Sequence, residues 1–460
     1  MYDEPNSFDA LKSQFKRSFQ EEPTFIVVAP GRVNLLGEHT DYNLLPVAPM
    51  CIDREIVMAV RERNDAEVRL ENTDPAFSGR SFSVSGKLTR GEPGDWANYA
   101  KAAIDTLIPF IEKTRAEKGK RGAPIRGFEA LTCSNLPPAA GLSSSSAMVV
   151  ASCLAFCAAN GFELEPAKMA ELMRKAERFV GTAGGGMDQA VISLSEPDEF
   201  LLIEFDPLKA APLPLPTDAR IFIVDSGEKA DKALGAKDEY NRRAVECLLA
   251  MHVMRKFAVE DVAWKDELPE AGKWASLRDV YNACRDAEIA WQQLLYAAVS
   301  RNPYSPEELF EKLGRDMVEQ VCATRQMPAL GGEPWCRWNG IVLYERAAHV
   351  FAESDRVFRL SEAVKNNDMG VMATLMNEGH ASCRDLFHLS TPRIERMIAR
   401  AHRAGAFAAR ITGAGFGGCI VVLVAKDEAE NFVRKFWEED PGASEIIAAK
   451  CNGGARVVAL

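Results

Sequence analysis

Residues 30–42 are Pro30-Gly31-Arg32-Val33-Asn34-Leu35-Leu36-Gly37-Glu38-His39-Thr40-Asp41-Tyr42. The preceding apolar run, Phe25-Ile26-Val27-Val28-Ala29, predicts a buried strand, and Pro30-Gly31 is expected to break it. A polar cluster then falls on a turn at a strand end, where convergent polar groups often form a binding site. Its members are Arg32, Glu38, His39 and Asp41. A solvated, salt-bridged loop is the alternative, because structural ion pairs also cluster charges.

The composition is that of an ordinary globular protein with room for two or three domains. Of its 460 residues, 47% are hydrophobic and 26% are charged. The net charge of −11 disfavours a nucleic-acid-binding surface, whose usual footprint is a basic patch. A nucleotide remains compatible with an acidic protein, because backbone amides and Mg²⁺ can bind phosphate.

Eleven cysteines occur without a Cys-x-x-Cys pair or a zinc-type Cys/His cluster. This pattern predicts free thiols in a reducing, cytoplasmic location. The longest apolar stretch, near residues 149–159, is too short to cross a bilayer. We therefore expect neither a membrane nor a nucleic acid as a partner.

A second informative stretch is Asn135-Leu136-Pro137-Pro138-Ala139-Ala140-Gly141-Leu142-Ser143-Ser144-Ser145-Ser146-Ala147, followed by a predicted helix over 148–160. Four serines open that helix. Free N–H groups and the helix dipole favour an anion at such a position, and a serine hydroxyl can reach a phosphate-bound Mg²⁺. An ordinary serine-rich helix cap is the alternative interpretation.

Two glycine-rich stretches follow. In Gly181-Thr182-Ala183-Gly184-Gly185-Gly186-Met187-Asp188-Gln189, the glycines allow close backbone approach to a ligand ahead of an aspartate, although a flexible loop with an N-capping Asp188 is also compatible. Residues 411–419 contain Gly-x-Gly-x-x-Gly, but the β-branched run after them predicts a strand instead of the helix that a dinucleotide site requires. No Walker motif or protein-kinase motif occurs.

The order of these stretches resembles that of the GHMP small-molecule kinases from about Ala29 to Val424. Residues 31–42 resemble the galactokinase signature of that family, and 135–147 resemble its phosphate loop, with Ala139 in place of the first glycine. Residues 96–101 are similar to a stretch that borders the adenine, 181–189 to a Gly-x-Met-Asp-Gln stretch, and 411–419 to a third motif that supports the phosphate loop.

The resemblance implies an α+β fold of two lobes. Residues 1–220 would form a ribosomal-protein-S5-like lobe with the sugar signature and the phosphate loop. Residues 221–460 would form a ferredoxin-like lobe, and three prolines between 211 and 218 mark the boundary. Residues 255–335 are expected to be helical and carry no recognisable motif.

The implied activity is transfer of the γ-phosphoryl group of ATP to the anomeric hydroxyl of galactose, giving galactose 1-phosphate. Asp188 would accept or orient the hydroxyl proton, and Arg32 would neutralise the transferred charge. Sugar contacts are expected from Glu38, His39, Asp41, Gly185 and Tyr240. ATP contacts are expected from Ala139, Ala140, Gly141, Leu142, Ser143, Ser144, Ser145, Trp96 and Tyr99, and Mg²⁺ ligands from Ser145 and Glu177.

Three alternatives remain at this point. The substrate could be a related sugar such as N-acetylgalactosamine or arabinose. Another member, such as a mevalonate or homoserine kinase, is disfavoured by the Glu-His-Thr-Asp-Tyr phrase at 38–42. A regulator that binds sugar and ATP without catalysis would share the fold. The expected partners are a small-molecule sugar and ATP, and the expected state is a monomer or weak oligomer.

Overall fold

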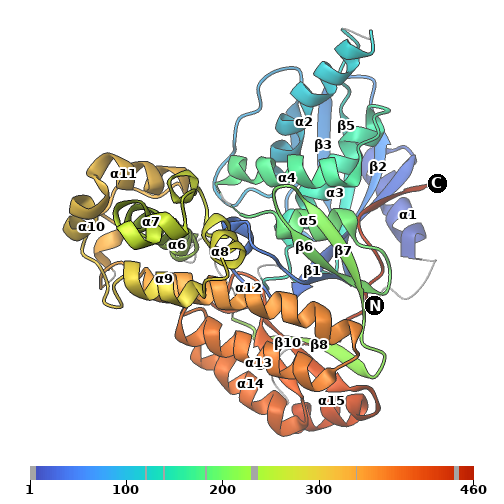
Figure 1. Ribbon diagram of the computed structural model, residues 1–460. Coiled ribbons are helices and arrows are strands. Elements are labelled where there is room, and N and C mark those ends of the chain that lie inside the picture. Colours follow the sequence, from blue (N-terminus) through green and yellow to red (C-terminus); the bar gives the residue numbers. More distant parts are fainter. Residues whose placement is uncertain are drawn as a thin grey trace.

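The computed structural model describes residues 7–119, 122–137, 140–181, 184–228, 237–337, 339–439 and 445–460. Two lobes and a helical extension make up this part of the chain (Figure 1). None of the helices within these ranges is both long enough and apolar enough to span a membrane.

The N-terminal lobe is built on a six-stranded sheet with the order β12-β1-β2-β5-β3-β4 in the described residues. β3 and β5 pair in parallel, and the other neighbours pair antiparallel. The strands are β1 (Phe25–Asn34), β2 (Pro49–Glu62), β3 (Glu67–Asn72), β4 (Arg80–Ser83), β5 (Phe128–Ser134) and β12 (Arg456–Ala459).

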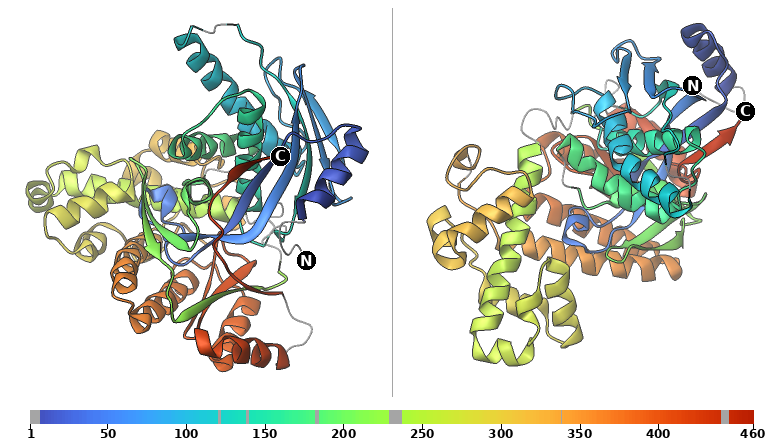
Figure 2. Two further views of the ribbon diagram at one scale, coloured as in Figure 1. Left: turned by 90° about the vertical axis from the view of Figure 1, so that its right-hand side faces the viewer. Right: turned by 90° about the horizontal axis from the view of Figure 1, so that it is seen from above.

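Helices cover both faces of this sheet, because successive side chains of a strand point to opposite faces. Ile26 and Val28 pack with Phe15 of α1 (Ser7–Phe19) on one face. Val27 and Ala29 join the larger core on the other face. In Figure 2, α1 and the helices of the larger core lie on opposite sides of the sheet. That larger core is covered by α2 (Ala97–Glu117), α3 (Ser144–Ala159), α4 (Pro166–Val180) and α5 (Met187–Leu194).

Strand β1 is longer than its sequence predicts. The expectation that Pro30-Gly31 ends the strand is wrong, because pairing with β2 resumes at Arg32 after a shift in register. A bulge absorbs the irregularity, and it needs a residue without a side chain there, since a methyl group on Gly31 would lie 2.7 Å from the Leu142 carbonyl oxygen. Arg32 is consequently held on a strand and not on a loop.

The C-terminal lobe contains an antiparallel sheet of four described strands in the order β11-β8-β10-β9. These are β8 (Ala219–Asp225), β9 (Ala408–Ile411), β10 (Cys419–Ala425) and β11 (Ile446–Ala448). Helices packed with them are α12 (Tyr344–Lys365), α13 (Met369–Asp385), α14 (Pro392–Ala404) and α15 (Ala429–Glu438). The two-lobed α+β fold expected from the sequence is confirmed.

The last strand departs from a simple division at residue 220. Residues 456–459 return from the C-terminal lobe and pair with Phe25–Val28 of β1 (Figure 1). They supply hydrogen-bond partners to a strand that would otherwise be an open edge. The sheet of the N-terminal lobe therefore includes residues 456–459. Apart from this strand, the division into residues 1–220 and 221–460 stays a prediction.

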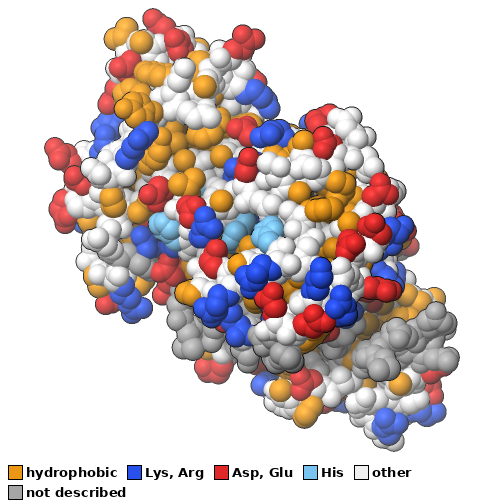
Figure 3. Space-filling model, turned by 90° about the horizontal axis from the view of Figure 1, so that it is seen from below, with side chains coloured by type: hydrophobic (Ala, Val, Ile, Leu, Met, Phe, Trp, Pro, Cys, Tyr) orange, Lys and Arg blue, Asp and Glu red, His pale blue; other side chains and the backbone are white. Residues whose placement is uncertain are grey.

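A hairpin and a helical extension complete the molecule. The hairpin is formed by β6 (Glu199–Glu204) and β7 (Lys209–Pro214). The extension consists of α6 (Lys237–Glu260), α7 (Val262–Glu267), α8 (Leu277–Asp286), α9 (Trp291–Ala298), α10 (Pro306–Leu313) and α11 (Arg315–Thr324). Just after α11, Arg325 donates to the backbone oxygen of Tyr42 at 3.1 Å, so the extension touches the galactokinase-like signature. On the face drawn in Figure 3, basic and acidic side chains are interspersed.

Candidate active site

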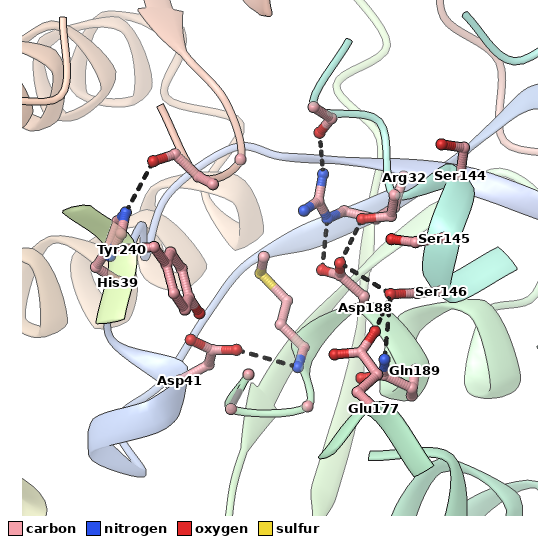
Figure 4. Close-up of a pocket in the computed structure, with 18 of the residues that line it drawn as sticks. Arg32, His39, Asp41, Ser144, Ser145, Ser146, Glu177, Asp188, Gln189 and Tyr240 are labelled. Carbon is pink, nitrogen blue, oxygen red and sulfur yellow. Dashed lines mark hydrogen bonds and ion pairs between the residues drawn. The ribbon is translucent and has the colours of Figure 1, made fainter. Parts of the chain in front are cut away.

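A cavity of about 330 Å³ lies between the lobes (Figure 4). Its wall combines β1 and the turn after it, α2, the start of α3, the end of α4 with the start of α5, the first turn of α6, and the β9–β10 turn. Thirteen of the predicted site residues line it: Arg32, Glu38, His39, Asp41, Tyr99, Gly141, Ser143, Ser144, Ser145, Glu177, Gly185, Asp188 and Tyr240.

Arg32 and Asp188 meet at the centre of this wall. Arg32 Nε donates to Asp188 Oδ1 at 2.8 Å, although the two residues are 156 positions apart in the sequence. Arg32 Nη1 also donates to the Gly141 carbonyl oxygen at 2.6 Å. Burial alone would lower the pKa of Arg32, but the carboxylates of Asp188 and Glu38 outweigh it and raise that pKa. A permanent cation is therefore fixed between the phosphate loop and an aspartate.

The serines at the start of α3 divide into two pairs. Ser143 donates to Asp188 Oδ2 at 2.5 Å, and Ser146 donates to Glu177 Oε1 at 2.6 Å. The hydroxyls of Ser144 and Ser145 form no hydrogen bond within the described residues, and both residues line the cavity. One pair thus positions the two carboxylates, and the other pair is available to a ligand.

Ser146 was not predicted as a site residue. It lies 3.3 Å from Asp188 Oδ2 and accepts from Gln189 Nε2 at 3.1 Å, so it links both carboxylates to α5 (Figure 4). Its spacing of three from Ser143, which puts both hydroxyls on one side of the first helical turn, is the signal that could have identified it.

Of the remaining residues predicted to contact the nucleotide, some line the cavity and others are buried in the hydrophobic core. Tyr99 lines the cavity. Trp96 does not, because its ring belongs to the hydrophobic core and its indole N–H donates to the Ser78 carbonyl oxygen at 2.9 Å. The side chains of Ala140 and Leu142 are also buried in that core. Ala139 lies outside the described residues.

Gly185 brings the Asp188 segment against the galactokinase-like signature. A methyl group on Gly185 would overlap the backbone of Asp41 and Tyr42, so only glycine permits this approach. Asp41 Oδ2 accepts from the backbone N–H of Met187 at 3.3 Å. Burial and then the charge of Asp188 raise the pKa of Asp41. Two acidic side chains, Asp41 and Asp188, therefore face one cavity.

His39 is held between rings and backbone. Its Nε2 lies 3.2 Å from the Ala414 carbonyl oxygen, which can only accept, so Nε2 carries the proton and Nδ1 accepts from the Tyr42 hydroxyl at 2.8 Å. The ring centroid of Tyr240 lies 5.1 Å from that of His39. Burial lowers the pKa of His39 to about 3, so the ring is neutral. A sugar hydroxyl would have to replace one of these two bonds to bind His39.

Glu38 is almost completely buried at 1% exposure. Its Oε1 accepts from the backbone N–H of Gly413 at 2.8 Å, and its Oε2 accepts from the Asn34 amide. Burial raises the pKa of Glu38 to about 7, while Arg410 and Arg32 act in the opposite direction. A proton on Glu38 is therefore held more tightly than on an exposed glutamate.

A buried network that the sequence does not reveal holds this segment from the C-terminal lobe. Glu353 Oε1 accepts from the Gly37 N–H and from Arg410 Nη2, both at 2.9 Å. The ring of His349 lies 3.0 Å from the Glu38 carbonyl oxygen. Glu353 and His349 lie on α12, 316 and 311 positions beyond Gly37 and Glu38, and Arg410 lies on β9, 57 positions beyond Glu353. No local spacing signals such contacts.

The third glycine-rich stretch forms the β9–β10 turn. Methyl groups on Gly413 and Gly418 would lie 2.7 Å from the Gly141 oxygen and 2.8 Å from the Ala140 oxygen, so this turn packs directly on the phosphate loop. A strand, β10, follows the glycines. The strand predicted after the glycines is confirmed, and the turn contacts the phosphate loop that it was predicted to support.

Family models match three parts of the chain. They are the galactokinase galactose-binding signature at residues 13–62, the GHMP kinases N terminal domain at 98–196, and the GHMP kinases C terminal domain at 360–441. Among solved structures, the Lactococcus lactis galactokinase complexed with galactose matches with a TM-score of 0.71 at 24% identity, covering 98% of this chain and 99% of that one. A mevalonate kinase matches with a TM-score of 0.53 at 16% identity, covering 95% and 99%. These likenesses show the fold.

Curated relatives match over nearly the full length. The galactokinase of Dictyostelium discoideum is 31% identical over 456 residues, covering 93% of this chain and 86% of the relative. That of Chloroflexus aurantiacus is 32% identical, covering 92% and 90%. The chain belongs to the galactokinase family of the GHMP kinases.

Proposed function

We propose that this protein is an ATP-dependent sugar kinase that converts galactose to galactose 1-phosphate. The observation that carries the proposal is the 2.8 Å pair of Arg32 and Asp188, which joins the galactokinase-like signature, the phosphate loop and α5 at one cavity. Phosphoryl transfer needs mainly alignment and charge stabilisation, and this arrangement provides both. Membership of the galactokinase family supports the same reaction.

In the proposed reaction the anomeric oxygen of the sugar forms a bond to the γ-phosphorus of ATP, and the bond from that phosphorus to the ADP oxygen breaks. The hydroxyl proton passes to a carboxylate oxygen of Asp188 and then to solvent. Proton acceptance by a positioned side chain contributes about 10²–10⁴-fold to a rate. Arg32 stabilises charge that develops on the transferred group, and its bond to the Gly141 oxygen holds it in place beforehand.

Mg²⁺ fits the side chains present. The hydroxyl of Ser145 and the carboxylate of Glu177 face the cavity, and both are oxygen donors of the kind that this ion prefers. Mg²⁺ usually takes one or two protein ligands and completes its shell with water and phosphate oxygens. When bound, it would neutralise charge on the phosphates of ATP. Ser146 would hold Glu177 in place for this role through its 2.6 Å hydrogen bond.

Sugar recognition would use Asp41, Glu38 and Tyr240. The hydroxyl of Tyr240 forms no hydrogen bond within the described residues, and the residue lines the cavity beside Asp41. A site with such groups rejects an analogue that lacks one hydroxyl, because its buried polar groups are left unpaired. We infer a cytoplasmic location from the eleven unpaired cysteines, ten of which are buried, and we keep a monomer or weak oligomer as a prediction.

The test is ADP release with Mg²⁺, ATP and a panel of free sugars: galactose, 2-deoxygalactose, N-acetylgalactosamine, arabinose and glucose. We expect the highest kcat/KM with galactose, and ³¹P NMR should identify the product as an anomeric phosphate. The matched control is Asp188→Asn, which should bind galactose and ATP but lose most of its turnover.

Two outcomes would contradict the proposal. A higher kcat/KM with N-acetylgalactosamine or arabinose would reassign the substrate. Binding of both ligands by the wild-type protein with no ADP release would show a regulator that shares the fold.

A further inference from the structure

Two basic side chains converge at one edge of the cavity. A methyl group on Gly181 would lie 2.5 Å from Lys237 Nζ and 3.4 Å from Arg90 Nη1. The sum of these distances limits the separation of the two nitrogens to 5.9 Å. Gly181 ends α4 one turn beyond Glu177, and it has a φ of +87°. Glycine thus leaves room for both cations at this point.

The two cations come from different parts of the fold, the N-terminal lobe and the helical extension. Arg90 lies between β4 and α2 in the N-terminal lobe, and Lys237 is the first residue of α6 beyond the boundary strand β8. Lys237 lines the cavity together with Tyr99 and Glu177. Arg90 is close enough to Tyr99 to influence its pKa. Both cations are therefore placed beside the part of the cavity that faces the phosphate loop and the proposed Mg²⁺ ligands.

The described residues offer these two cations no ion pair. In the part of the chain that the structure describes, no carboxylate lies within ion-pair distance of Arg90 or Lys237. Burial, and then the charge of Arg90, lowers the pKa of Lys237, and together they outweigh the opposing effect of the adjacent Asp238. Holding two like charges together is unfavourable unless an anion joins them. The carbonyl end of α4 offers partial compensation, because a helix C-terminus attracts cations.

We propose that Arg90 and Lys237 bind the phosphate chain of ATP from the side of the cavity opposite the phosphate-loop amides. This inference rests on the proposed function and adds two residues that no motif contains. ATP carries several negative charges, and a pair of cations that forms no ion pair among the described residues is a suitable counterpart for them. Because Arg90 lies in the N-terminal lobe and Lys237 begins the helical extension, a phosphate chain bound by the pair would contact both parts.

The test measures nucleotide affinity by calorimetry without sugar, so that no turnover occurs. Lys237→Met and Arg90→Met should each weaken MgATP binding roughly 10-fold, since a hydrogen bond to a charged group is lost. Affinity for adenosine, which lacks phosphate, should not change. Lys237→Arg should bind MgATP within about 3-fold of wild type, because the charge remains. Lys265→Met, at an exposed lysine of α7, is the control that should leave both affinities unaltered.

A second readout separates this role from capping of α4. If the pair binds phosphate, removing either cation relieves repulsion, so the melting temperature of the free protein should stay constant or rise. A fall in melting temperature with unchanged MgATP affinity would overturn the proposal in favour of a structural role. Weaker adenosine binding would overturn it in favour of contact with the base or ribose.

The experiment separates a failure of the proposed sugar-kinase function from a failure of the proposed role of Arg90 and Lys237. A wild-type protein that binds MgATP but phosphorylates no sugar would contradict the proposed function and leave the comparison of variants intact. Variants that bind MgATP as tightly as wild type would contradict the cation pair even if galactose is phosphorylated normally.

Discussion

Glu38→Gln should stabilise the protein above neutral pH, although Glu38 lies in the most characteristic stretch of the sequence. Burial raises its pKa to about 7. The folded protein therefore binds a proton here more tightly than the unfolded chain does, and stability is lost as pH rises through this range. Glutamine has the shape of the protonated side chain and does not titrate, so the variant avoids this loss.

The structure also supplies a donor–acceptor arrangement for glutamine. The Oδ1 of Asn34 is buried without a hydrogen-bond partner among the described residues. A half-turn of the Asn34 amide would direct this oxygen at position 38, where a protonated glutamate or a glutamine can donate to it. The other oxygen of residue 38 would still accept from the Gly413 N–H, as it does at 2.8 Å in the wild type.

The magnitude follows from the difference between an ordinary glutamate pKa of 4.5 and about 7. At about 1.36 kcal/mol per pKa unit, this difference corresponds to about 3 kcal/mol. Most of it, about 2.5 kcal/mol, should develop between pH 5 and pH 8. The advantage of Glu38→Gln over wild type is therefore small at pH 5 and largest at pH 8.

Equilibrium urea unfolding of both proteins at pH 5, 6, 7 and 8 measures this advantage, and the difference between them largely removes the contributions of other titrating groups. The control is Glu353→Gln in the same buried network. Burial would raise the pKa of Glu353, but Arg410 and Arg356 outweigh it and hold that pKa well below its ordinary value. Losing this charge leaves two buried arginines unpaired and should cost about 3–5 kcal/mol at pH 7.

The two glutamates thus give opposite signs. The reasoning is refuted if Glu38→Gln is less stable than wild type at pH 8, or if its advantage is the same at every pH. Either result would mean that Glu38 is ionised in the folded protein and that Arg410 and Arg32 compensate for its burial.

Three further predictions concern turnover. Asp188→Asn should lower kcat by about 10²–10⁴-fold while galactose binding, measured by calorimetry, persists. Gly185→Ala should raise the KM for galactose at least about 10-fold, because the added methyl group would overlap the Asp41 backbone and displace the segment around Asp41. An unchanged KM would place the sugar elsewhere. Ser146→Ala should raise the Mg²⁺ concentration for half-maximal activity roughly 10-fold by releasing Glu177, and an unchanged requirement would contradict that positioning role.

The sequence predicts the chemistry better than it predicts the geometry. Each chemically important side chain lies in a stretch whose glycines, serines or charges stand out locally. The meeting of Arg32 with Asp188, however, followed from the family resemblance, because no local spacing relates positions 156 apart. The error at Pro30-Gly31 has a local cause, because a turn and a strand bulge favour the same residues. In the fold, Gly31 packs closely against Leu136 and Leu142, and the strand continues through the bulge.

What the sequence could not reveal is mostly long-range. The strand at residues 456–459 is short and carries no motif, yet it closes the sheet beside β1. Trp96 illustrates the converse, since its motif suggests a ligand contact and its indole N–H instead bonds a core carbonyl. In the sequence, Glu353 and Arg410 have no feature that distinguishes them from other charged residues. Only the fold places them, fully buried, beside the segment around Glu38.

This last placement bears on how the site is assembled. The N-terminal lobe fixes Arg32 and Asp188 through the phosphate loop and α5. The C-terminal lobe fixes the segment around Glu38, because Glu353 holds the Gly37 N–H and the Gly413 N–H bonds the Glu38 carboxylate. The pair of Arg32 and Asp188 and the segment at Gly37 and Glu38 are therefore positioned by different lobes. A change in the packing between the lobes should alter the alignment of sugar with phosphate before it alters either half of the site, so that kcat falls while each substrate still binds.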